Sequence, residues 1–76
     1  MLETVDALVP VLAYQQSRAH IFSSLESLRW FMQRNRSALA DAGAIMKLAG
    51  RIHVAPDIFD SVVIAVGRES AQRAAA

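Results

Sequence analysis

Six basic side chains in the middle of the chain are the residues whose type and spacing point to chemistry. They are Arg18, Arg29, Arg34, Arg36, Lys47 and Arg51. Within residues 18–53 they are opposed by only Glu26 and Asp41, so this stretch carries a net charge of +4 although the whole chain carries +1. Because the field near a patch depends on its nearest charges, a nearly neutral chain can still offer a local anion-binding surface. The alternative is that these arginines only solvate helix faces.

The side chains of catalysis and metal binding are sparse by comparison. The chain has no cysteine, and its two histidines, His20 and His53, have no second ligand at metal-binding spacing. Its three glycines, Gly43, Gly50 and Gly67, stand alone and form no phosphate-binding loop. No nucleophile and base can be paired either. We therefore expect no enzyme, no catalytic residue, no metal, no cofactor and no small-molecule ligand.

Length and composition limit the class of protein. A chain of 76 residues allows one small domain, and a hydrophobic content of 54% is too high for a disordered chain. No apolar run approaches the roughly 18 residues of a membrane span. Glu3 and Asp6 stand where a signal peptide would carry basic residues. We expect a soluble cytoplasmic protein with no membrane partner.

Two helices are predicted in the first half, after a lead-in over residues 1–10 that is extended or weakly helical. Pro10 restricts Val9, and a short helix should run from Val11 to Ala19. A turn at His20-Ile21-Phe22 should follow. Ser23 and Glu26 have the spacing of a capping box, which predicts a helix from Ser23 to about Arg34 or Arg36. Its buried stripe comprises Leu25, Leu28, Phe31 and Met32.

A shorter helix over residues 37–42 should end at Gly43, which suits a C-cap. The β-prone runs 45–48 and 52–54 then predict a hairpin around residues 49–51. A two-residue turn would pair Lys47 with Ile52 on one face. A three-residue turn instead pairs Leu48 with Ile52, Met46 with Val54 and Lys47 with His53. We predict the second register because it turns the four apolar side chains to the core.

A closing helix is predicted to begin at Pro56, with Asp57 and Asp60 near its positive end. Its buried stripe is Ile58, Phe59, Val62, Val63 and Val66. Gly67 should end the helix, and residues 68–76 should form a frayed or mobile tail. The predicted fold class is mostly α with a small β-hairpin, in the element order of a winged helix-turn-helix domain over residues 11–67.

This order predicts a surface that binds DNA. The helix from Ser23 would enter the major groove, and the hairpin would lie on the neighbouring backbone or in the minor groove. Arginine and glutamine reach base edges, whereas serine and a helix N-terminus hold phosphate. The predicted DNA-binding residues are Ser24, Ser27, Arg29, Gln33, Arg34, Lys47, Arg51 and His53.

Short motifs also resemble a known family. The segments Ser24–Phe31 (SLESLRWF), Ala42–Ile45 (AGAI), Gly50-Arg51 and Pro56–Asp60 (PDIFD) resemble those of small excisionase-like winged helix-turn-helix proteins. Those proteins occur on bacterial plasmids, prophages and integrated elements and are related to the MerR-type DNA-binding domain. The resemblance covers roughly residues 11–67. It implies a recognition helix from Ser23, a wing from Lys47 to His53, and a role in transcription regulation or in DNA bending for recombination.

The expected partner is double-stranded DNA. Because one copy can neutralise only a few phosphates, a homodimer or a cooperative array on DNA is also expected. The chief alternative is a protein-interaction module on the same scaffold, with Trp30 and the apolar segment 8–12 as its contact surface. The two differ in a measurable way, since DNA binding should weaken with salt and an apolar interface should not.

Overall fold

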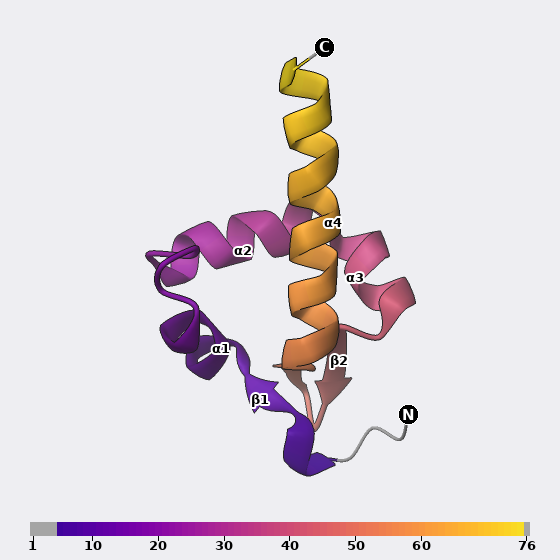
Figure 1. Cartoon of the computed structure of the whole chain (residues 1–76). Helices are drawn as coiled ribbons and strands as arrows, with labels where there is room; N and C mark the ends of the chain where they lie inside the picture. Colours follow the sequence, from indigo (N-terminus) through magenta and orange to yellow (C-terminus); the bar gives the residue numbers. More distant parts are fainter. Residues whose placement is uncertain (1–4, 76) are drawn as a thin grey trace.

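The computed structural model describes residues 5–75, in which three short helices follow a two-residue strand and precede a β-hairpin and a long last helix. In chain order they are η1 (Val5–Ala7), β1 (Val9–Pro10), α1 (Val11–Ser17), α2 (Leu25–Arg34), α3 (Arg36–Ala42), β2 (Ile45–Leu48), β3 (Arg51–Val54) and α4 (Pro56–Ala75). The three strands form an antiparallel sheet in the order β1-β3-β2. The mostly helical class with a β-hairpin is thus confirmed (Figure 1).

The core lies where α1, α2 and α3 meet the base of the sheet and the first half of α4. Its fully buried large side chains are Tyr14, Leu28, Leu39, Val54 and Phe59. An aromatic cluster joins the helices: the Phe59 ring lies 4.6 Å from Tyr14 and 5.8 Å from Phe31 between centroids, in tilted geometry. Such pairs add to the stabilisation from buried area. Burial of Leu28 and partial burial of Phe31 and Met32 confirm the predicted stripe of α2.

Helix α2 starts two residues later than predicted, and a different pair caps it. The Ser24 hydroxyl accepts a hydrogen bond from the Ser27 amide at 3.1 Å, and the Ser24 amide donates to the Ser27 hydroxyl at 3.3 Å. The predicted box of Ser23 with Glu26 is therefore wrong by one residue. The preceding helix α1 also stops at Ser17 instead of Ala19, so residues 18–24 form a longer connection than the predicted turn.

The end of α3 follows the prediction. Gly43 adopts the left-handed conformation at φ 78°, and its amide donates to Ala40 while the Ala44 amide donates to Leu39. These two bonds are those of a Schellman motif, which satisfies the last carbonyls of a helix.

The hairpin register contradicts the prediction. A two-residue turn pairs Lys47 with Ile52 and Leu48 with Arg51, so that Ile45 and not Met46 lies opposite Val54. Ala49 and Gly50 both have positive φ (50° and 77°), as a type I′ turn requires. The predicted alternation fails because only the base of the hairpin reaches the core. Farther out, Lys47 and Ile52 share a face at little cost, since both are exposed.

The lead-in contains a strand that the sequence did not indicate. Val9 pairs with Val54 and Pro10 with His53, which makes β1 an edge strand where a proline is tolerated. The predicted lead-in residues 1–4 lie outside the described residues.

Helix α4 begins at Pro56 as predicted but does not end at Gly67. It continues to Ala75 and projects beyond the rest of the molecule (Figure 1). The prediction that Gly67 ends the helix is therefore wrong. A glycine inside a helix costs only about 1 kcal/mol relative to alanine, and the residues after it are mostly strong helix formers. An ion pair between Glu69 and Arg73 at 3.0 Å further supports the last turns.

Candidate nucleic-acid interface

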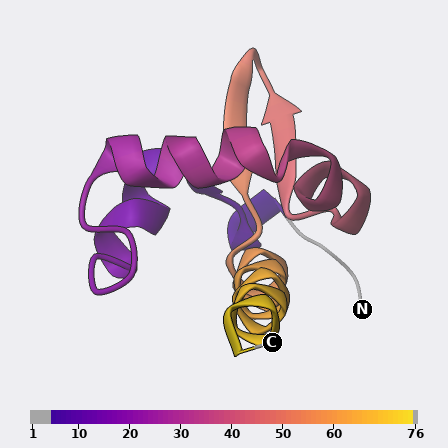
Figure 2. The same ribbon diagram turned by 90° about the horizontal axis from the view of Figure 1, so that it is seen from above.

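A groove of about 730 Å³ separates α2 from the hairpin. Figure 2 shows the hairpin projecting past α2 on the side away from α4. Residues from both elements, from the start of α3 and from the junction of β1 and α1 line the groove. They are Pro10, Val11, Arg29, Met32, Gln33, Arg36, Ile45, Arg51, Ile52 and His53.

The groove gathers three arginines from three elements. Arg29 comes from α2, Arg36 from the start of α3 and Arg51 from β3, and all three are exposed. No carboxylate lines the groove among residues 5–75, and no ion pair joins these arginines to a described acidic side chain. A concave surface lined by one sign of charge concentrates counter-ions. The groove therefore suits an extended anion.

Polar and apolar groups accompany the arginines. Gln33 adds an amide, and His53 lies at the edge of the groove with its Nδ1 3.1 Å from the Arg51 carbonyl oxygen. Met32, Ile45 and Ile52 make part of the lining apolar. The groove thus places hydrogen-bond donors beside an apolar surface.

Four of the predicted DNA-binding residues meet in this groove: Arg29, Gln33, Arg51 and His53. Lys47 is exposed and pairs with Ile52 across the hairpin, but it is not among the residues that line the groove. Arg34 lies on another face of α2, with its guanidinium 5.7 Å from the centre of the Trp30 ring. Ser24 and Ser27 lie at the N-terminus of α2, where they cap each other's amides.

Arg36 was missed as a site residue, although it was counted in the basic stretch. Because α2 ends at Arg34, helical spacing from Arg29 and Gln33 does not carry over to Arg36, which reaches the groove from the start of α3. The part of the groove at Pro10 and Val11 had no local signal in the sequence either, because it depends on the pairing of β1 with β3.

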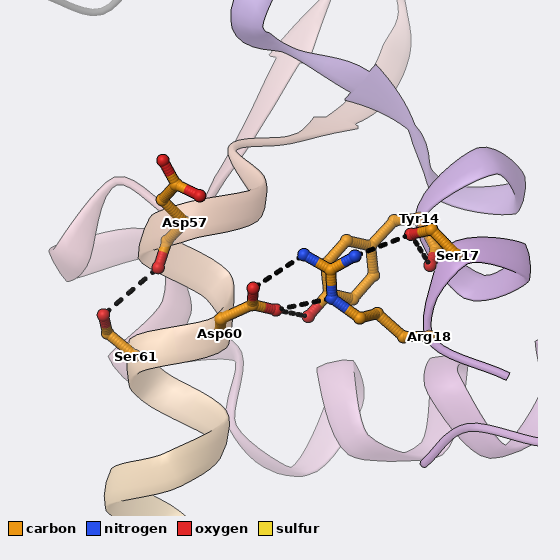
Figure 3. A network of polar contacts seen from close by, with 6 residues as sticks. All are labelled: Tyr14, Ser17, Arg18, Asp57, Asp60 and Ser61. Carbon is orange, nitrogen blue, oxygen red and sulfur yellow. Dashed lines mark hydrogen bonds and ion pairs between the residues drawn. The ribbon is translucent and has the colours of Figure 1, made fainter. Parts of the chain in front are cut away.

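A second polar cluster joins α1 to α4 on another side of the molecule. The Arg18 guanidinium donates to both oxygens of Asp60, Nε to Oδ1 at 3.0 Å and Nη2 to Oδ2 at 2.7 Å. The Tyr14 hydroxyl donates to Oδ1 of the same carboxylate at 2.6 Å (Figure 3). Arg18 also lies over the Tyr14 ring, 5.0 Å from its centre.

These contacts change how the residues of the cluster titrate. The Arg18 hydrogen bonds hold the pKa of Asp60 below its usual range. Burial, together with the hydrogen bond to Asp60, raises the pKa of Tyr14. Arg18 therefore has a structural role. Of the six basic side chains in residues 18–53, it is paired with a carboxylate and does not add to the positive charge of the groove.

Residues 5–75 include no group of three or more His, Asp or Glu side chains placed to share a metal ion. In the same range, no helix has both the length and the apolarity to cross a membrane. Comparisons with protein-family models, with curated proteins and with solved structures find no match for this chain.

Proposed function

We propose that this protein binds double-stranded DNA as a winged helix-turn-helix domain. In this proposal α2 enters the major groove and the β2–β3 hairpin is the wing. Between the DNA major groove, which holds α2, and the part of the DNA that the wing contacts runs one sugar-phosphate backbone. This backbone lies between α2 and the hairpin of the protein, where Arg29, Arg36 and Arg51 neutralise its phosphates. The observation that carries the proposal is the meeting of these three arginines, from three elements, in one groove that no described carboxylate lines.

The dimensions of the two partners agree with this placement. The major groove of B-DNA is about 12 Å wide and admits an α-helix. The exposed face of α2 also carries Glu26, Gln33 and Arg34, which have hydrogen-bonding groups that match base edges. The serine cap leaves the N-terminus of α2 exposed, where helix amides favour phosphate.

The small number of unpaired cations also bears on assembly. Each phosphate contact contributes to affinity by releasing a counterion, and three to five such contacts give weak binding at physiological salt. The proposal therefore includes binding as a homodimer or as a row of copies on DNA. The biological role would be that of a transcription regulator or of an accessory factor in recombination.

Fluorescence anisotropy on labelled duplexes, at about 50 to 200 mM salt, tests the proposal. The groove variant Arg29→Ala, Arg51→Ala should lose at least tenfold in affinity and reduce the magnitude of the log–log salt slope by about 2, because two phosphate contacts are gone. The matched control is Arg68→Ala, Arg73→Ala. It removes the same charge from the exposed end of α4 and should bind as the wild type does.

Equal weakening by both double variants would contradict the proposed site, since total charge and not the groove would then govern binding. A wild-type protein that binds no duplex even at low salt would contradict the function itself. In that case, a partner pull-down through the exposed Trp30 surface would test the protein-interaction alternative.

A further inference from the structure

Trp30 is the only tryptophan of the chain, and it is 61% exposed. It lies on α2 two residues after the fully buried Leu28, about 200° around the helix, and so near the centre of the outer face. Its neighbours one turn away are Glu26, Gln33 and Arg34, all exposed. The core described here does not include it. A large aromatic ring at this position gives the outer face of α2 an apolar surface that a ligand of this face would contact.

Arg34 holds one face of this ring. Its guanidinium carbon lies 5.7 Å from the ring centre, within the range of a cation–π contact. The contact restricts the rotation of the indole and covers one of its faces with positive charge. Most of the Trp30 surface stays open to solvent, so the pair presents an apolar surface to a ligand.

The charge around Trp30 selects the kind of partner. Arg34 lies over the ring and Arg29 precedes Trp30 in α2, and Glu26 is the one acidic side chain one helical turn away among the described residues. Gln33, which adjoins Trp30 on α2, also lines the groove. With α2 in the major groove, as proposed, the outer face of the helix that carries Trp30 lies against the base edges. The apolar feature that DNA offers in its major groove is the C5-methyl group of thymine.

We propose that Trp30 contacts a thymine C5-methyl group in the major groove and that Arg34 positions the ring for this contact. This inference rests on the proposed DNA binding and adds to it a base preference. Trp30 would be a specificity residue, whereas Arg29, Arg36 and Arg51 supply affinity without reading sequence.

The test begins with a duplex selected by the wild-type protein from a random library. Each thymine of the selected site is replaced in turn by deoxyuridine, which lacks only the methyl group. One or two replacements should weaken wild-type binding about fourfold each, the value of one buried methyl group. In Trp30→Ala the same replacements should have no effect. The matched control Ile64→Ala removes another exposed apolar side chain, on α4, and should keep the discrimination.

A second measurement reports proximity directly. Replacing the same thymine by 5-bromodeoxyuridine puts a heavy atom of similar size in place of the methyl group. Affinity should be kept, and Trp30 fluorescence should be quenched at that position and not at a bromine several base pairs away. The single tryptophan makes the signal unambiguous.

The possible failures are distinct. Equal binding to every thymine and deoxyuridine duplex, or discrimination that survives in Trp30→Ala, overturns the thymine contact and leaves DNA binding in place. Loss of self-association in Trp30→Ala with thymine discrimination unchanged would assign the ring to a protein interface. Absence of any salt-sensitive binding by the wild type would overturn both the contact and the proposed function.

Discussion

Arg18 and Arg51 are the same kind of side chain in two different surroundings. At the α1–α4 contact, Arg18 forms a bidentate pair with Asp60 while Tyr14 donates to the same carboxylate. In the groove between α2 and the hairpin, Arg51 lies with Arg29 and Arg36, and no described carboxylate lines the groove. In the first cluster the charge of Arg18 is balanced by that of Asp60, and the pair joins two helices. In the second, the positive charge is not balanced and faces solvent.

The difference shows that the number of arginines in a sequence does not give the number available to a ligand. That number depends on which arginines the fold pairs with carboxylates. Asp60 is 42 residues from Arg18 in sequence, so the pair depends on the way α4 packs against α1. Where such a pair forms, the charge serves stability, and where it does not, the charge is available to a ligand. Substitutions at the two sites should therefore separate stability from binding.

The largest expected effect on stability is at the cluster of Tyr14, Arg18 and Asp60. Asp60→Ala leaves the half-buried Arg18 and the Tyr14 hydroxyl without their acceptor, and we expect the free energy of unfolding to fall by about 1–2 kcal/mol in urea denaturation. Arg29→Ala should change it by less than about 0.5 kcal/mol, because an exposed side chain without a partner is removed. Conversely, DNA affinity should fall in Arg29→Ala and be kept in folded Asp60→Ala. Equal destabilisation by the two substitutions would contradict the assignment of a structural role to the Arg18–Asp60 pair and not to Arg29.

The pH dependence of stability should follow the same cluster. The folded pKa of Asp60 is lowered, so its stabilisation is complete above the unfolded value of about 3.9 and is lost as the pH falls through the lower folded pKa. The folded pKa of Tyr14 is raised, so its stabilisation is present below about pH 10 and is lost as the pH rises above that value.

Absorbance of the phenolate measures the alkaline limb, and the single tyrosine makes the assignment certain. In Asp60→Asn the Tyr14 pKa should fall towards its ordinary value, because the negative charge that disfavours phenolate is gone, and the acid limb should become shallower. An alkaline titration unchanged in Asp60→Asn would show that burial alone sets the Tyr14 pKa.

Local signals in the sequence predicted the elements whose ends depend on local chemistry. Pro56 begins α4, Gly43 ends α3, and the spacing of Leu28, Phe31 and Met32 predicted the buried stripe of α2. The register of the hairpin was predicted wrongly because the alternation rule assumes that the whole hairpin packs on the core. In the structure the pair of Ile45 with Val54 lies at the core, and turn geometry at Ala49-Gly50 decides the rest.

Features that depend on distant parts of the chain could not be predicted. A strand of two residues, β1, has too few positions to show alternation, yet it brings Pro10 to the lining of the groove. The pairing of Arg18 with Asp60 had no local signal either. For the site, spacing along one helix placed Arg29 and Gln33 together, and the hairpin brought Arg51 and His53 to them.

The smallest expected effect concerns the second ion pair of the described chain. Arg73 donates to Glu69 at 3.0 Å, close to the distances in the Arg18–Asp60 pair, but both side chains are about 70% exposed, against 27% and 36% for Arg18 and Asp60. Arg73→Gln keeps the helix propensity and removes the charge, and we expect it to lower the free energy of unfolding by no more than about 0.5 kcal/mol. Urea denaturation beside Asp60→Ala makes the measurement. A loss as large as that of Asp60→Ala would mean that the contact distance determines how much these ion pairs stabilise the protein. Burial and the additional hydrogen bond from Tyr14 would then contribute little.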